Sequence, residues 1–117
     1  MTTAVFSVVY VTVPNQEVAN KIAKSVVEKK HAACVNIVPG IKSIYQWKGK
    51  IEEDNELLLI IKTKTSELER LKADVLKNHP YEVPEFISLP IESGSEPYLK
   101  WINEQVGESE QQLKHDS

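Results

Sequence analysis

The segment from Cys34 to Ile51 is CVNIVPGIKSIYQWKGKI, and it constrains the architecture more than any other part of the chain. Its β-branched and aromatic residues predict a long strand over residues 33–47, with a break at Pro39-Gly40. Lys48-Gly49 predicts a tight hairpin turn, because a two-residue turn needs positive φ, which glycine adopts freely. A second long strand is therefore expected over residues 50–64.

The flanking sequence predicts the rest of a small α+β domain. Further strands are expected over residues 6–13 and 85–91, and helices over residues 15–31, 66–79 and 95–106. Asn15 is a good N-cap for the first helix, and Ser66 with Glu69 forms a capping box for the second. The order β-α-β-β-α-β plus a helix predicts a ferredoxin-like fold, with an antiparallel four-stranded sheet and two helices on one face. Right-handed crossovers place the first and third strands at the centre of this sheet.

Composition limits the classes of function. The 117 residues suit one domain, which we expect over residues 1–106, with a polar and disordered tail over 107–117. A net charge of -3 argues against nucleic-acid binding, which usually needs a basic face. No apolar run is long enough to insert into a bilayer, and no signal-peptide pattern opens the sequence, so a cytoplasmic protein is expected. A single cysteine excludes an internal disulfide.

The strands are apolar on both faces, which predicts self-association. Residues 57–61 are LLLII and residues 8–11 are VVYV, whereas a strand with one wet face should alternate apolar and polar residues. An exposed face of this kind would be larger than monomers tolerate. We therefore expect an obligate homo-oligomer, for which a trimer is a natural closure. The alternative is a monomer in which the third helix covers this face alone.

The long hairpin strengthens the expectation of an oligomer. Its outer ends, at residues 45–47 and 51–53, are expected to extend beyond the body of the domain. Such an arm has exposed backbone edges, which invite pairing with a strand of a neighbouring copy.

Two residues are candidate metal ligands, and each also has a purely structural interpretation. Cys34 is either a thiolate ligand for a soft metal or a buried, apolar thiol in a strand. His79 is either a ligand or proton carrier, or a residue that caps the negative end of a helix dipole. One cysteine and one histidine are a weak indication of a metal site within one chain. The indication is stronger only if several subunits contribute ligands to one site at an interface.

Other side chains are candidates for a pocket. Lys62 lies late in an apolar strand, so it needs a partner such as Glu85 or a bound anion. Tyr45, Trp47 and Tyr81 either line a pocket or pack in the core and at an interface. The chain lacks the G-x-S-x-G, P-loop and G-x-G-x-x-G motifs, so we predict that it is not an enzyme.

Several motifs follow one another along the chain: CVNIVPG at 34–40, SIYQWKGKI at 43–51, IKT at 61–63, HPYEVPE at 79–85 and YLKW at 98–101. Together they resemble the CutA family of divalent-cation tolerance proteins. The resemblance covers residues 6–106 and implies a ferredoxin-like trimer similar in shape to the PII signalling proteins. It also implies binding of Cu(II) and other divalent ions, with a link to copper tolerance in bacteria. In mammals the family is associated with anchoring of acetylcholinesterase at neuronal membranes, and plant relatives are targeted to chloroplasts.

The family's metal positions carry over in part. Cys34 and His79 match one cysteine and one histidine of the bacterial metal set, whereas Val11 and Asn78 stand where a second of each is found. The resemblance thus implies low-affinity Cu(II) binding, because one sulfur and one imidazole per subunit make a poor chelate.

A second group of positions matches the family better than the metal ligands do. It comprises Tyr45, Trp47, Lys62, Tyr81, Glu82 and Glu85, and we expect it to form a cleft between subunits. The favoured function is a trimeric, non-enzymatic metal-binding protein. The alternative is a PII-like signalling or scaffold trimer whose clefts bind a small anion or a protein partner.

Overall fold

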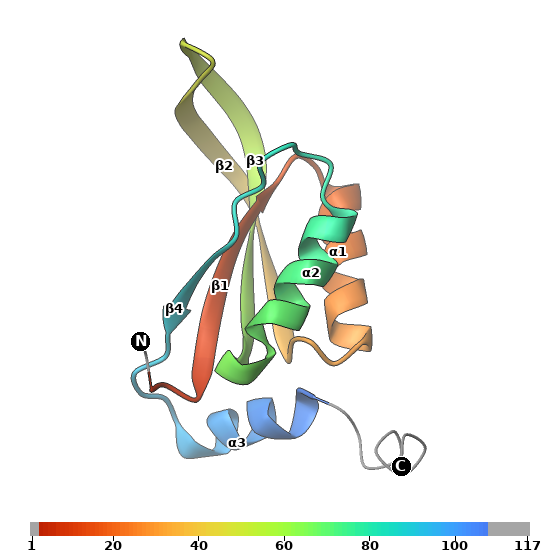
Figure 1. The fold of residues 1–117 in the computed structure, drawn as a ribbon, viewed down its shortest axis with the longest axis vertical. Helices are drawn as coiled ribbons and strands as arrows, with labels where there is room; N and C mark the ends of the chain where they lie inside the picture. Colours follow the sequence, from red (N-terminus) through yellow and green to blue (C-terminus); the bar gives the residue numbers. More distant parts are fainter. Residues whose placement is uncertain (1–2, 108–117) are drawn as a thin grey trace.

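The computed structural model describes residues 3–107, which form an antiparallel four-stranded sheet and three α-helices (Figure 1). The strands are β1 (Phe6–Val13), β2 (Cys34–Trp47), β3 (Lys50–Lys64) and β4 (Ile87–Pro90). The helices are α1 (Gln16–Glu28), α2 (Leu68–Asn78) and α3 (Glu96–Gln105), and a 3-10 turn spans Thr65–Glu67. The strand order is β2-β3-β1-β4, so the predicted ferredoxin-like fold and its central strands β1 and β3 are confirmed.

Helices α1 and α2 cover one face of the sheet and close the main core (Figure 1). Along β1, Val9, Val11 and Val13 are fully buried and alternate with half-buried residues, as the two-residue period of a strand requires. Ile22 of α1 and Leu71 of α2 pack into the same cluster. The central strands therefore anchor the helices through one face only.

The opposite face, called here the open face, is only partly covered. It carries Val8 and Tyr10 of β1, which pair with Leu89 and Ile87 of β4. Helix α3 lies across one end of the sheet, where Ile102 packs with Phe6 and Ala33 in a second, smaller cluster (Figure 1). Helix α3 does not cover the rest of the open face, because Ile87 and Leu89 remain exposed.

The β2–β3 hairpin forms as predicted and extends beyond the helices (Figure 1). Lys48 and Gly49 both have positive φ, of 51° and 81°, which gives the turn the twist that a two-residue hairpin needs. Within β2 the register shifts between Val38 and Ile41, and Gly40 has a φ of 77°. Pro39 lacks a backbone N–H and cannot donate a hydrogen bond to β3, so the pairing of the two strands is interrupted at this position.

The predicted boundaries differ from the structure at three places. The Ser66 capping box is wrong, because Ser66 lies in the 3-10 turn and α2 begins at Leu68 without a side-chain cap. The Glu67 carboxylate is buried instead and accepts hydrogen bonds from Arg70 and His31. Helix α1 ends at Glu28, and β4 covers only Ile87–Pro90. Of the expected tail over 107–117, residues 108–117 lie outside the described part of the chain.

Within residues 3–107, we find no helix that combines the length and the apolar character needed to cross a membrane.

Candidate functional site

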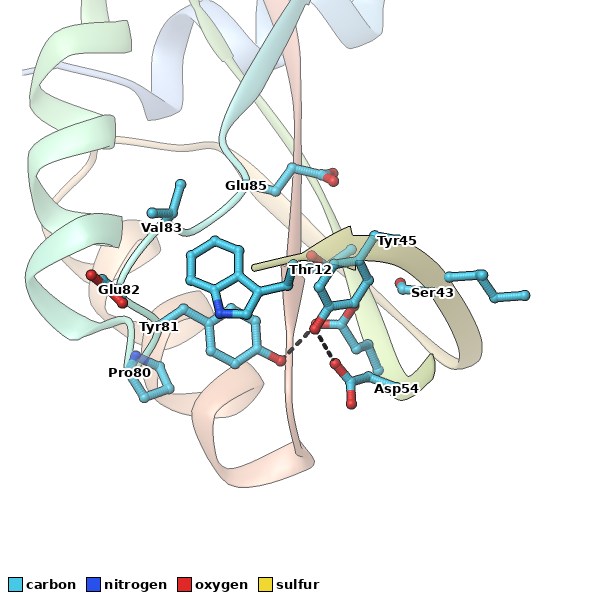
Figure 2. A pocket seen from close by; sticks show the side chains of 12 residues that line it. Thr12, Ser43, Tyr45, Asp54, Pro80, Tyr81, Glu82, Val83 and Glu85 are labelled. Carbon is cyan, nitrogen blue, oxygen red and sulfur yellow. Dashed lines mark hydrogen bonds between the residues drawn. The ribbon is translucent and has the colours of Figure 1, made fainter. Parts of the chain in front are cut away.

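A cavity of about 690 Å³ lies between the hairpin and the segment that follows α2 (Figure 2). The hairpin and β1 contribute side chains to one wall, and residues 80–85 contribute the other. The lining residues are Thr12, Ser43, Ile44, Tyr45, Trp47, Asp54, Glu56, Pro80, Tyr81, Glu82, Val83 and Glu85. The volume falls within the range of small-molecule sites in proteins.

His79 fixes the position of the second wall. Helix α2 ends at Asn78, and the backbone becomes extended at His79, as the following proline requires. The imidazole is buried; its Nε2 donates to the Thr12 carbonyl at 2.8 Å, and its Nδ1 accepts from the Tyr81 N–H at 3.2 Å. A carbonyl can only accept, so these two contacts define the tautomer and use both ring nitrogens. His79 therefore holds the segment after α2 against the end of β1.

Two phenol–carboxylate pairs line the cavity. The Tyr81 hydroxyl donates to Glu56 Oε2 at 2.7 Å, and burial together with this bond raises the pKa of Tyr81. The Tyr45 hydroxyl donates to Asp54, and this hydrogen bond is the main cause that raises the pKa of Tyr45 to about 12. Figure 2 shows the side chains of Tyr45 and Tyr81 on opposite walls, pointing toward each other. Both phenols thus remain protonated donors at neutral pH.

The cavity is strongly acidic. Its twelve lining residues include four carboxylates, from Asp54, Glu56, Glu82 and Glu85, and no lysine, arginine or histidine. Burial, followed by the negative charge of Glu56, raises the pKa of Glu85. Such a field repels the small anion considered for the signalling alternative and attracts a cation.

Five of the six residues predicted to form a cleft line this cavity: Tyr45, Trp47, Tyr81, Glu82 and Glu85. Lys62 does not. It pairs in register with Cys34 and Val8 near the other end of the sheet, and its ammonium donates to the Asn36 side chain rather than pairing with Glu85.

Sequence reasoning missed Asp54 and Glu56. Strand alternation could have found them, because acidic residues two positions apart in a predicted strand share one face.

The two predicted metal ligands lie apart. Cys34 begins β2 and lies beside Asn36 and Lys62. Tyr98 of α3 is also close to Cys34: burial is the main cause that raises the pKa of Tyr98, and the nearby Cys34 raises it further. The strand register places Cys34 level with Val8 of β1, whereas His79 contacts Thr12. Four strand residues separate these levels by about 13 Å. One chain therefore does not bring Cys34 and His79 together.

The two positions that correspond to the family's other metal ligands do not complete a metal centre within one chain. Val11, which stands where the family has a second cysteine, lies fully buried in the core. Asn78 donates through its amide to Asp74 at 2.9 Å. Across the described residues, no three His, Cys, Asp or Glu side chains gather as a metal site. Because a divalent-metal centre usually needs three or four ligands, this donor set does not fit one.

A family model described as "CutA1 divalent ion tolerance protein" matches residues 7–105. The divalent-cation tolerance protein CutA of Thermus thermophilus is 54% identical over 100 residues, which cover 86% of this chain and 97% of that protein. The chloroplastic CutA protein of Arabidopsis thaliana is 60% identical over 95 residues, covering 81% of this chain. The human CutA protein is 56% identical over 103 residues, covering 88% of this chain. The matched parts span only 52% and 57% of the Arabidopsis and human proteins.

Solved structures give the same result. The crystal structure of CutA1 from Oryza sativa superimposes with a TM-score of 0.86 at 53% identity, covering 92% of this chain and 100% of that chain. The structure of the divalent cation tolerance protein from Thermus thermophilus gives a TM-score of 0.85 at 53% identity, covering 87% of this chain and 99% of that chain. Both the sequence and the backbone thus agree over nearly all the described residues.

Proposed function

Because this chain belongs to the CutA1 family of divalent ion tolerance proteins, we propose that it acts as a homotrimer in the cellular response to divalent cations. In this proposal it works in the cytoplasm, binds Cu(II) weakly near a subunit interface and catalyses no reaction. The family match supports the link to divalent cations, and the open face of the sheet supports the assembly.

The open face is the observation that carries the proposal. Ile87 and Leu89 of β4 lie exposed beside the half-buried Val8 and Tyr10 of β1. Burying one such aliphatic side chain contributes about 1.5–3 kcal/mol. A three-fold arrangement lets identical faces cover one another in a closed assembly, so that no apolar edge remains for further growth.

Cys34 is the metal ligand that this assembly favours. It shares the open face with Lys62, its neighbour in register, so its thiolate can meet donors from a second copy. His79 would have to release one of its two hydrogen bonds to bind a metal. Cu(II) binding is therefore expected to be weak and to depend more on Cys34 than on His79.

A titration of Cu(II) into the full chain tests the metal site. We expect Cys34→Ser to weaken Cu(II) binding, and a matched Ser88→Ala substitution on β4 to leave it unchanged. The double variant Cys34→Ser/His79→Ala is measured below its melting temperature, with circular dichroism as the control for folding. An unchanged affinity in the double variant would remove this site.

The cavity favours a second candidate function, that of a PII-like signalling or scaffold trimer. The wall at residues 80–85 is stiffened by Pro80 and Pro84 and held by His79, so the cavity is largely formed before any ligand binds. A thermal-shift screen of metals against metabolites separates the two candidates, because a ligand that prefers the folded state raises the melting temperature. Affinity capture tests the related role as a partner that anchors an enzyme at a membrane.

A further inference from the structure

We propose that the cavity between the hairpin and residues 80–85 binds an aliphatic diammonium or polyammonium cation. The inference rests on the second candidate function, in which the cavity takes a small ligand, and it is independent of the proposed Cys34 metal site.

The charge of the cavity selects a cation. Four carboxylates line it and none of its lining residues carries a positive charge, so its walls hold more negative charge than the net -3 of the whole chain. Walls of one sign concentrate the field within a cleft and raise the local concentration of oppositely charged ligands. More than one ammonium group is needed to balance this charge.

Glu56 offers a buried acceptor. The residue is only 6% exposed and lines the cavity, and its Oε2 is taken by Tyr81. Within residues 3–107 the hydrogen bond to Glu56 is made at Oε2, and no buried side-chain oxygen lacks a partner, so Oε1 is open to the cavity rather than sealed in the protein. An ammonium group that enters the cavity can add both an opposite charge and a hydrogen-bond donor at this open oxygen.

The aromatic walls suit the methylene segments and the charge of such a ligand. Trp47, Tyr45 and Tyr81 line the cavity together with the carboxylates. The chain already places an ammonium on one of these rings, since Lys48 Nζ lies 5.7 Å from the centroid of Trp47. A cation within about 6 Å of an indole centroid is attracted by the electron-rich face of the ring.

The size and spacing favour a chain-like cation over a bare metal ion. Asp54 and Glu56 share one face of β3 two residues apart, which separates them by about 6.8 Å. A short methylene chain with an ammonium at each end can reach both carboxylates and fill the space between them. A divalent ion would fill little of a cavity of about 690 Å³, and the described residues gather no metal ligand set.

Isothermal titration of the full, oligomeric chain with 1,4-diaminobutane and spermidine tests the proposal. We expect both to bind, spermidine more tightly, and 1,4-butanediol, which has hydroxyls in place of the ammonium groups, not to bind. Glu56→Gln should weaken binding at least tenfold while still accepting from Tyr81. Glu53→Gln removes the same charge from an exposed position on the same strand outside the cavity, and should leave the affinity unchanged.

The proposal would be overturned by equal binding of 1,4-butanediol, by equal losses in Glu56→Gln and Glu53→Gln, or by no binding of either amine. Displacement of the bound amines by an equimolar amount of Mg²⁺ would also overturn it and would assign the cavity to a metal ion. If Glu56→Gln fails to fold, Glu85→Gln removes a charge from an exposed position on the opposite wall and is expected to weaken binding several-fold. The Cu(II) titration of Cys34→Ser uses a different part of the sheet, so failure of either proposal is recognised independently of the other.

Discussion

The Tyr81 hydroxyl donates a 2.7 Å hydrogen bond to the buried carboxylate of Glu56, and this contact joins the segment after α2 to the base of the β2–β3 hairpin. His79 holds the same segment against β1 through the Thr12 carbonyl. The two contacts fix both walls of the cavity by hydrogen bonds between residues distant in the sequence. Removing either contact should loosen the cavity as well as lower stability.

Substitution of Tyr81 by Phe tests the first contact. The variant leaves the Glu56 carboxylate buried without its donor, which should lower the free energy of unfolding by about 1–3 kcal/mol. Tyr45→Phe is the matched control, because it removes an equivalent phenol from an exposed residue and should change stability far less. Urea unfolding at one fixed protein concentration measures both variants. Equal effects would show that burial of Glu56 is not the cause.

Glu85 should contribute a pH dependence of opposite sign to that of a carboxylate in a salt bridge. Burial and the charge of Glu56 raise its folded pKa above the ordinary value of 4.5, so the folded chain holds this proton more tightly than the unfolded chain. This contribution to stability is present below the unfolded pKa and is lost as the pH rises through the folded pKa.

Glu85→Gln removes this dependence. Relative to wild type, the variant should become more stable as the pH rises from about 4 toward neutrality, by less than about 1 kcal/mol because solvent screens this largely exposed group. Unfolding curves at several pH values measure the difference. A difference that is flat with pH, or that falls, contradicts the assigned pKa direction.

The fold could be predicted because its signals are local. The hairpin follows from strand periodicity and from Lys48-Gly49, whose positive φ values match the expected turn. The Ser66 capping box failed because a tertiary contact overrides it: the Glu67 carboxylate turns inward to His31, and the helix starts later. A capping signal reports only what the neighbouring residues prefer.

The cavity could be predicted only in part. Strand alternation gives the face on which a side chain lies, but not where along the strand a cavity opens. Lys62 and Glu56 share one face of β3, yet six residues separate them by about 20 Å, and only Glu56 lines the cavity. The position depends on how far residues 80–85 reach along the sheet, which the contact of His79 with Thr12 determines.

Substitution of His79 by Ala tests whether its contact with Thr12 holds residues 80–85 in place. The change removes two hydrogen bonds from a residue only 9% exposed and leaves the Thr12 carbonyl without its donor, so we expect a loss of about 1–3 kcal/mol. Lys77→Ala, at an exposed position two residues earlier, serves as the control and should stay within about 0.5 kcal/mol of wild type. Thermal and urea unfolding measure the difference. A neutral His79→Ala variant would mean that residues 80–85 are held by other contacts.

The proposed assembly predicts that charge on the open face dissociates the oligomer. Leu89 on β4 and Val27 on α1 are almost equally exposed in the single chain, at 43% and 42%, but they lie on opposite sides of the molecule. If copies pack through the open face, Leu89→Lys places a charge in each interface and loses the burial of an aliphatic side chain, about 1.5–3 kcal/mol per copy. Sedimentation velocity at micromolar concentration should then show smaller species for Leu89→Lys and an unchanged trimer for Val27→Lys. A wild-type chain that sediments as a monomer, or a Val27→Lys variant that dissociates while Leu89→Lys does not, would place the interface elsewhere or remove it.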